Sequence, residues 1–145
     1  MEFSRDLPTT PYISLIYRFH AKFLNNKVKD VNITYGLYPF LIEIYKHDGI
    51  SQEDLANLFF LNESTVTRNL NKLEKRGYIK RTPEKRKKII SLTDEGAAIA
   101  RKVMDYDEKW DDLIKKDLSE EEYINFKKTL IKVCEAIIWI KLLKI

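Results

Sequence analysis

Apolar residues recur at helical spacing over most of this chain, and this pattern predicts a mainly α-helical fold. Residues 12–29 carry the first apolar stripe. The second stripe covers residues 37–48 with Pro39 in its first turn, where a proline costs no intrahelical hydrogen bond. Two further helices are predicted to begin at Ser51 and at Asn62, because both side chains can cap a helix.

Two short strands are predicted to follow the fourth helix, which ends before Gly77. The segments 78–81 and 88–92 have the composition of strands, and residues 82–87 join them as a turn. Helix, turn, helix and hairpin follow one another in this order. We therefore predict a mainly α fold with a small β-hairpin wing, in which residues 34–96 form a winged helix-turn-helix domain that binds DNA.

Two long helices complete the chain. Thr93 caps the first of them, and Ser119 with Glu122 forms a capping box at the start of the second. A monomer would leave the apolar stripes of the terminal helices in water, so we predict a homodimer with residues 1–33 and 97–145 as its dimerisation region. The predicted dimer interface comprises Ile13, Ile16, Phe126, Leu130, Val133, Ile137 and Ile140.

The composition excludes several other classes of protein. Of the 145 residues, 44% are hydrophobic and 33% are charged, which is typical of a globular protein. No apolar run reaches the roughly 20 residues of a membrane span, and no secretory signal is visible, so we expect a cytoplasmic protein. The single cysteine, Cys134, cannot form an intramolecular disulfide. We expect its thiol to be buried and inert, because it follows Val133 on the apolar seam of the last helix.

Motifs for catalysis are missing from the sequence. It has no phosphate-binding loop, no dinucleotide-binding turn and no zinc-protease motif. His20 and His47 lie far apart, and neither has a carboxylate or thiol partner at the spacing of metal ligands. We predict that the protein is not an enzyme and has no catalytic residue, cofactor or metal site.

Positive charge is concentrated in one part of the chain. The segment 68–88 contains ten basic and two acidic residues, a net charge of +8, whereas the whole chain carries +4. The remainder therefore carries a net charge of −4. A basic segment on an otherwise acidic chain indicates a polyanionic partner, although an isolated run of this kind is more often a solvated helix face.

The polar face of the fourth helix favours DNA over a solvated face. Arginine pairs with guanine and asparagine with adenine in the major groove, while hydroxyls and lysines hold phosphates. A basic hairpin beside such a helix can reach the neighbouring minor groove. The predicted DNA-binding residues are Ser51, Gln52, Ser64, Thr65, Thr67, Arg68, Asn69, Asn71, Lys72, Arg81, Lys85, Arg86 and Lys87.

In this order and spacing, the motifs resemble those of the MarR family of bacterial and archaeal transcriptional regulators. The matching pieces are GISQEDLA at 49–56, STVTR at 64–68, LEKRGYI at 73–79, Arg81, EKR at 84–86 and LTDEG at 92–96. The resemblance implies a triangular dimer with intertwined terminal helices, bound to a pseudo-palindromic operator. Members usually repress transcription, and many release DNA on binding small aromatic acids, drugs or oxidants.

The wing departs from the family pattern. Glu84 takes the place of the aspartate in the family's Asp-x-Arg motif, Arg86 matches the arginine, and the turn is about three residues shorter. Our hypothesis is that Arg86 still contacts DNA while a neighbouring lysine serves the phosphates.

The resemblance also implies an effector site between the dimer helices and the winged domain. Four residues with polar tips are candidates for lining it, namely Tyr17, His20, Tyr38 and Tyr45. The alternative is that these tyrosines simply pack with a hydroxyl at the surface and that His20 serves the core or the interface. A non-specific architectural DNA-binding protein, or a protein-interaction adaptor without effector, is the alternative to a sequence-specific repressor.

Overall fold

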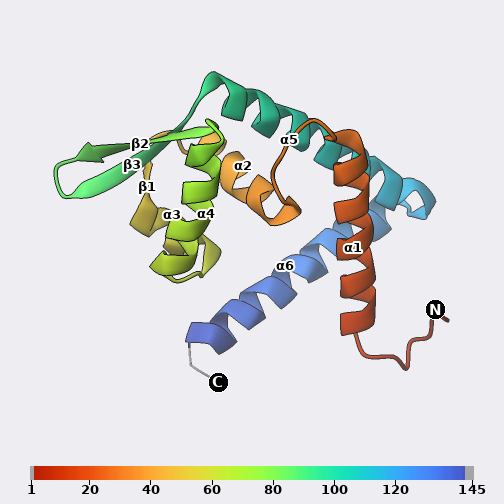
Figure 1. Ribbon diagram of the computed structural model, residues 1–145. Helices are drawn as coiled ribbons and strands as arrows, with labels where there is room; N and C mark the ends of the chain where they lie inside the picture. The colour runs from red at the N-terminus through yellow and green to blue at the C-terminus, as the bar shows by residue number, and fades with distance from the viewer. Residues whose placement is uncertain (1, 143–145) are drawn as a thin grey trace. The chain divides into compact units, whose positions relative to one another are not determined.

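A computed structural model describes residues 2–142, and Figure 1 shows their arrangement. Met1 and residues 143–145, which belong to the predicted dimerisation region, lie outside the described residues. The chain divides into two compact units, Met1–Asp107 and Glu108–Ile145. The elements are α1 (Thr10–Lys27), the 3₁₀ helix η1 (Tyr35–Leu37), α2 (Tyr38–Lys46), β1 (Ile50–Ser51), α3 (Gln52–Phe59), α4 (Glu63–Lys75), β2 (Ile79–Glu84), β3 (Lys87–Leu92), α5 (Asp94–Ile114), the 3₁₀ helix η2 (Lys115–Asp117) and α6 (Glu120–Leu142).

The predicted helix starts in the middle of the chain are confirmed. Pro39 lies in the first turn of α2. At the start of α3 the Ser51 hydroxyl accepts a hydrogen bond from the backbone N–H of Asp54 at 3.0 Å. The side chain of Asn62 accepts one from the N–H of Thr65 at 2.8 Å at the start of α4. Each cap satisfies a backbone donor that has no partner inside its helix, and this fixes where the helix begins.

The sheet is larger than the predicted hairpin. It has three antiparallel strands in the order β1-β3-β2, and Ile50 of the unpredicted strand β1 lies opposite Ile90 of β3. The predicted turn was too long, because β2 continues through Pro83 and only Lys85 and Arg86 remain between the strands. A proline has no N–H to donate, but β2 is an edge strand, where that loss is tolerated.

The winged-helix core lies between α2, α3, α4 and the sheet. Helix α4 contributes a buried apolar stripe to it, since Val66, Leu70 and Leu73 are each 0% exposed. These side chains belong to one cluster with the buried side chains of Leu37, Phe40, Leu41, Ile44, Leu55, Ala56, Ile79, Ile90 and Ala100. This cluster holds α4 in place against the rest of the unit.

Glycine is required where α5 starts. A Cβ on Gly96 would lie 2.0 Å from the backbone carbonyl oxygen of Tyr78. The Thr93 hydroxyl accepts a hydrogen bond from the N–H of Gly96 at 3.1 Å and donates one to the carbonyl of Gly77 at 2.6 Å. Gly77, with φ of +78°, ends the preceding helix in the left-handed region, as predicted. These contacts join the end of α4 directly to the start of α5.

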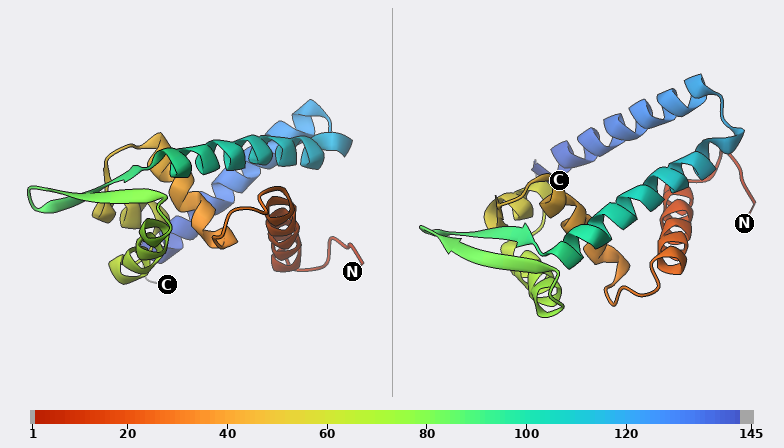
Figure 2. Two further views of the ribbon diagram at one scale, coloured as in Figure 1. Left: turned by 45° about the horizontal axis from the view of Figure 1, so that its top comes forward. Right: turned by 90° about the horizontal axis from the view of Figure 1, so that it is seen from above.

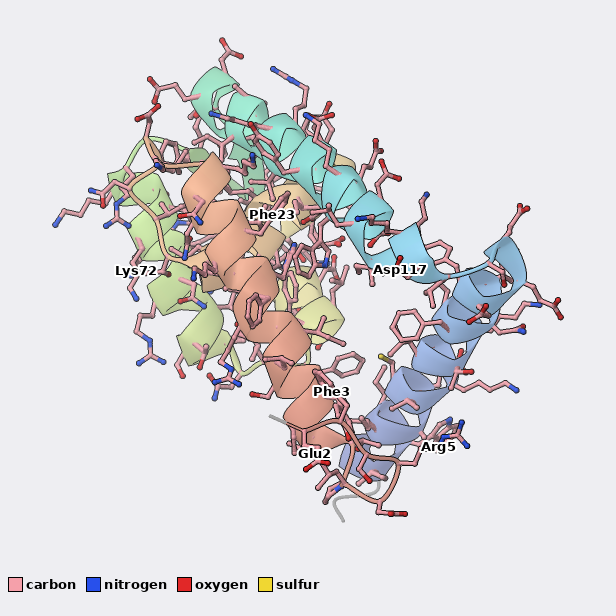
Figure 3. All side chains as sticks on the ribbon, turned by 90° about the vertical axis from the view of Figure 1, so that its right-hand side faces the viewer. Glu2, Phe3, Arg5, Phe23, Lys72 and Asp117 are labelled. Carbon is pink, nitrogen blue, oxygen red and sulfur yellow. The ribbon has the colours of Figure 1, made fainter. Side chains whose placement is uncertain are left out.

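A second buried cluster connects α1 with α2 and α5. It contains Leu24, Val28, Tyr38 and Val103. Phe23 of α1 faces α5, where its ring lies edge-on to the ring of Tyr106 with centroids 6.2 Å apart (Figure 3). The half of α1 that follows His20 is therefore anchored to the same unit as the winged helix.

In the unit formed by residues 108–145, α6 begins with the predicted capping box. The Ser119 hydroxyl accepts a hydrogen bond from the N–H of Glu122 at 3.1 Å, and the Glu122 carboxylate accepts one from the N–H of Ser119 at 3.3 Å. Tyr123 donates a hydrogen bond to the carboxylate of Asp111 at 2.9 Å, and Lys127 forms an ion pair with the same oxygen at 3.2 Å. These polar contacts fix the turn between α5 and α6.

The expectation that Cys134 is buried was wrong for the single chain, because its side chain is exposed. The apolar seam of α6 on which it was placed is itself largely exposed, and this leaves the thiol uncovered. In the part of the chain that the structure describes, no helix is long and apolar enough to cross a membrane.

Candidate nucleic-acid interface

The turn between α3 and α4 is short and well defined. Phe60 adopts a left-handed conformation with φ of +54°, which is uncommon for an aromatic residue. The N–H of Leu61 donates to the carbonyl of Ala56 at 3.0 Å, and the N–H of Phe60 donates to the carbonyl of Asn57 at 3.2 Å. These bonds satisfy the end of α3 within three residues and set the direction in which α4 leaves.

The polar side of α4 is directed away from the core. Its exposed positions include Ser64, Arg68, Asn71 and Lys72, and Thr65, Thr67 and Asn69 beside them are partly buried. Figure 3 shows Lys72 extending outward from α4. The structure therefore brings all seven residues predicted from α4 onto its accessible side.

Part of this polar side is fixed by contacts within the protein. The Gln52 amide donates a hydrogen bond to the Thr67 hydroxyl at 2.6 Å and so connects the start of α3 to α4. Arg68 donates one to the Thr65 hydroxyl at 3.4 Å. Ser51 is only 6% exposed, and its hydroxyl is the cap of α3. The Ser51 hydroxyl therefore serves the start of α3.

The wing extends away from the helices of its unit, as both views in Figure 2 show for the hairpin of β2 and β3. Lys85 and Arg86 form its tip, and both side chains are exposed. Lys85 has φ of +55°, a conformation that a tight two-residue hairpin turn demands and that lysine adopts at some cost. Lys87, predicted within the turn, instead lies opposite Glu84 at the start of β3.

A hollow of about 320 Å³ lies beside the starts of α3 and α4. Basic side chains from the wing and carboxylates from the helices both line it, so the hairpin and the helix-turn-helix contribute to one surface. Lys88, which the sequence analysis did not select, also lines it. The full lining is Ser51, Gln52, Glu53, Glu63, Thr67, Arg86, Lys87 and Lys88.

Arg81 differs from the other predicted contacts because its side chain is only 15% exposed. Its Nε donates to the Glu74 carboxylate at 2.7 Å, and its Nη2 donates to the Asn71 carboxamide oxygen at 2.5 Å. The hydrogen bond from Arg81 holds the pKa of the Glu74 carboxyl below its usual range. The sequence analysis missed Glu74, although it is one of only two acidic residues in the basic segment.

The four residues predicted to line an effector site lie in two separate places. Tyr17, His20 and Tyr38 surround Tyr35, whose ring centroid lies 5.1, 5.5 and 6.4 Å from theirs, respectively. Tyr45 lies instead beside Arg101, whose guanidinium carbon is 6.0 Å from its ring centroid. The sequence analysis missed Tyr35, because nothing in the local pattern connects it with α1.

His20 has a carboxylate partner after all. Its Nε2 lies 2.8 Å from the Asp107 carboxylate, and its Nδ1 is hydrogen-bonded to the Tyr35 hydroxyl. The prediction concerned partners at the spacing of metal ligands, and Asp107 is 87 positions away. It was wrong for His47, whose Nε2 lies 3.7 Å from the carboxylate of Glu43 four positions earlier. Burial, with smaller contributions from Tyr17 and Asp107, raises the pKa of Tyr35 to about 12. Burial likewise raises the pKa of Tyr38.

Known proteins resemble this chain in sequence. The family model described as MarR family matches residues 33–88. The HTH-type transcriptional regulator BilQ of Clostridioides difficile (strain CD3) is 32% identical over 106 residues, which cover 71% of this chain and 72% of BilQ. The chain belongs to the MarR family. The resemblance that its motifs indicated is thereby confirmed.

Solved structures extend the likeness to nearly the whole chain. A crystal structure of MarR matches with a TM-score of 0.81 at 28% identity, covering 97% of this chain and 98% of that one. The complex of S. aureus MepR with DNA matches with a TM-score of 0.81 at 23% identity, covering 91% of this chain and 99% of MepR. This MarR-family chain is thus a winged helix-turn-helix transcriptional regulator and not an enzyme.

Proposed function

We propose that this regulator binds a pseudo-palindromic operator in double-stranded DNA as a homodimer and represses transcription there. The observation that carries the proposal is the surface on which the polar side of α4, the start of α3 and the basic wing lie together. In the major groove, such a helix offers donors and acceptors to base edges, and flanking cations neutralise phosphates.

The exposed groups divide by chemistry. Arg68 projects from α4 and suits the paired acceptors of guanine, whereas Lys72 suits a phosphate. At the wing tip, Arg86 contacts a groove edge and the neighbouring Lys85 or Lys87 holds the backbone. The two-residue turn makes this a short wing, so these contacts require the hairpin to lie close to the DNA.

Exposed apolar side chains at both ends of the chain support the proposed homodimer. Ile13 and Ile16 on α1 are exposed, as are Leu130, Val133 and Ile137 on α6. A second copy would remove these side chains from water and supply the two-fold symmetry that a palindromic operator requires. MepR, which has the same fold, has been solved as a complex with DNA.

The proposal extends to a small aromatic effector that releases the DNA. The aromatic cluster of Tyr17, His20, Tyr35 and Tyr38 supports it, because it combines ring faces with hydroxyl and imidazole groups. A panel of small aromatic acids tested by thermal shift checks this part. A compound that binds should raise the melting temperature and weaken DNA binding, and Tyr35→Phe should reduce both effects.

Selection from a random duplex pool at near-physiological salt tests the central proposal. We expect an enriched inverted repeat with half-sites about one helical turn apart. Salt-sensitive binding without any enriched sequence would overturn it in favour of an architectural protein. No binding to duplex DNA at all would favour a protein-interaction adaptor.

The selected operator then tests the wing and the direction of regulation. Arg86→Ala should weaken binding and lower the salt slope by about one, whereas Lys22→Ala on α1 should change neither. Unchanged affinity and slope for Arg86→Ala would contradict the assigned contact. A reporter gene behind the operator should be expressed less when the protein is present, and increased expression would show activation instead.

A further inference from the structure

Arg81 connects the recognition helix to the first strand of the wing through a branched set of hydrogen bonds. Its Nε and Nη2 both donate to the Glu74 carboxylate, at 2.7 and 3.3 Å. The same Nη2 donates to the Oδ1 atom of Asn71 at 2.5 Å. Glu74 and Asn71 lie three positions apart on α4, so one guanidinium reaches two adjacent side chains on one side of the helix.

The contact decides which way the Asn71 carboxamide points. A guanidinium is only a donor, so the atom that Asn71 turns toward Arg81 must be its oxygen. The side chain of Asn71 is exposed, and its NH₂ group is therefore left on the side away from Arg81. Asn71 therefore presents its two N–H donors toward the surroundings, while Arg81 takes one of the two lone pairs of its oxygen.

We propose that Arg81 is a positioning residue, rather than a DNA contact, which turns the oxygen of Asn71 toward itself and leaves the N–H donors of Asn71 to face DNA. The proposal rests on the proposed function of α4 as the recognition helix. Asparagine reads adenine through one acceptor and one donor that point at the base together, and an oxygen held toward Arg81 is not free to turn onto the base with the N–H donors. It suits the acceptor atoms of a guanine edge or of a phosphate instead.

The positioning itself is testable without DNA. In the full-length protein, nuclear magnetic resonance relaxation should show a restrained carboxamide for Asn71 and a mobile one for Asn25, an exposed asparagine on α1. Arg81→Lys keeps the charge but loses the fork that reaches two acceptors. It should make the Asn71 carboxamide as mobile as that of Asn25. Equal mobility of the two carboxamides in the unaltered protein would overturn the proposal.

The consequence for DNA is tested by a double-mutant cycle on the selected operator. Arg81→Lys and Asn71→Ala should each weaken binding about fivefold, the effect of one hydrogen bond. The double variant should bind about as well as Asn71→Ala alone, because both changes remove the same contact. Losses that multiply would overturn the proposal and indicate independent contacts of Arg81 and Asn71.

Repeating the selection with Arg81→Lys distinguishes a base edge from a phosphate as the group that Asn71 contacts. A base preference that changes at one position of each half-site identifies a base edge, and weaker binding with unchanged preferences identifies a phosphate. Both support an Asn71 that contacts DNA through its N–H donors. A preference for adenine at that position in the unaltered protein, retained in the variant, would overturn it.

Glu74→Ala distinguishes positioning from simple electrostatics. Removing a negative charge from the DNA-facing side should strengthen binding to every duplex if charge alone matters. If Glu74 anchors Arg81, the same change should lower the ratio of operator affinity to random-duplex affinity. An unchanged or raised ratio would overturn the proposal. Failure of the unaltered protein to select any sequence would refute the proposed function, while the relaxation experiment would still decide the positioning.

Discussion

Apolar side chains are buried in the winged-helix core, whereas similar side chains on helix α6 are exposed. In the core, Leu70 of α4 is 0% exposed and packs among buried side chains from several elements. On α6, Ile137 is 58% exposed and Trp139 is 64% exposed. Both helices carry apolar residues at steps of three and four, so periodicity alone does not reveal this difference.

The difference shows what each apolar stripe stabilises. A stripe that is buried within its own chain stabilises the fold whatever the protein concentration. A stripe that is exposed in the single chain stabilises the protein only when a partner covers it. The partner we propose is a second copy of the chain. The predictions below test this contrast, from the largest expected effect to the smallest.

Leu70→Ala should affect folding and leave the proposed association of folded chains unchanged. Truncating a fully buried leucine leaves a cavity and lowers the free energy of unfolding by about 2–5 kcal/mol. Urea unfolding measures this loss, and sedimentation of the folded variant measures association. An unchanged free energy of unfolding together with weaker association would mean that Leu70 serves the interface and not the core.

Gly96→Ala should also destabilise the first unit, because its added Cβ would meet the Tyr78 carbonyl at 2.0 Å. Moving α5 away from that backbone should lower the free energy of unfolding by about 1–3 kcal/mol or more. Gly36→Ala is the matched control, since a Cβ there would have nothing within 4 Å. Thermal unfolding of both variants checks the expectation, and equal melting temperatures would contradict the close packing.

Ile137→Asp should weaken the proposed dimer and leave the winged-helix core intact. A charge that must be buried at an interface raises the dissociation constant of the dimer by about 100-fold. Lys128→Glu, an exposed change off the apolar stripe of the same helix, should leave it unaltered. Light scattering across a dilution series measures both. Should Ile137→Asp remain as dimeric as the control, α6 would not be the interface.

Tyr35→Phe probes the joint between α1, η1 and α5, with the smallest effect. Burial raises the pKa of Tyr35 to about 12 from its ordinary value of 10. Above pH 10 the unfolded chain has lost this proton and the folded chain still holds it, so its contribution to stability is present below pH 10 and is lost between pH 10 and 12.

Ultraviolet titration of tyrosinate checks this directly. The unaltered protein should show late-titrating tyrosines, among them Tyr35 and Tyr38, and Tyr35→Phe should remove one of these late steps. Below pH 10 the variant should lose only about 1 kcal/mol, the worth of its hydrogen bond to His20. If Tyr35→Phe instead removed a step near pH 10, Tyr35 would be accessible in solution.

Local chemistry let the sequence determine much of the fold. Ser51 and Asn62 were recognisable as helix caps because a cap bonds to residues only three positions away. Gly77 was recognisable as a helix end because few other residues tolerate positive φ. The family motifs then identified the winged helix, and the polar side of α4 followed from its helical period.

Tertiary structure alone decided the partners of the charged and polar residues. Arg81 was predicted as a DNA contact, and only the structure revealed its hydrogen bond to Glu74 on the preceding helix. His20 looked isolated because Asp107 is 87 positions away in the chain. A hydrogen bond depends on the positions of two side chains in space. Sequence spacing gives those positions only within one element, and the packing of α1, η1 and α5 gives the rest.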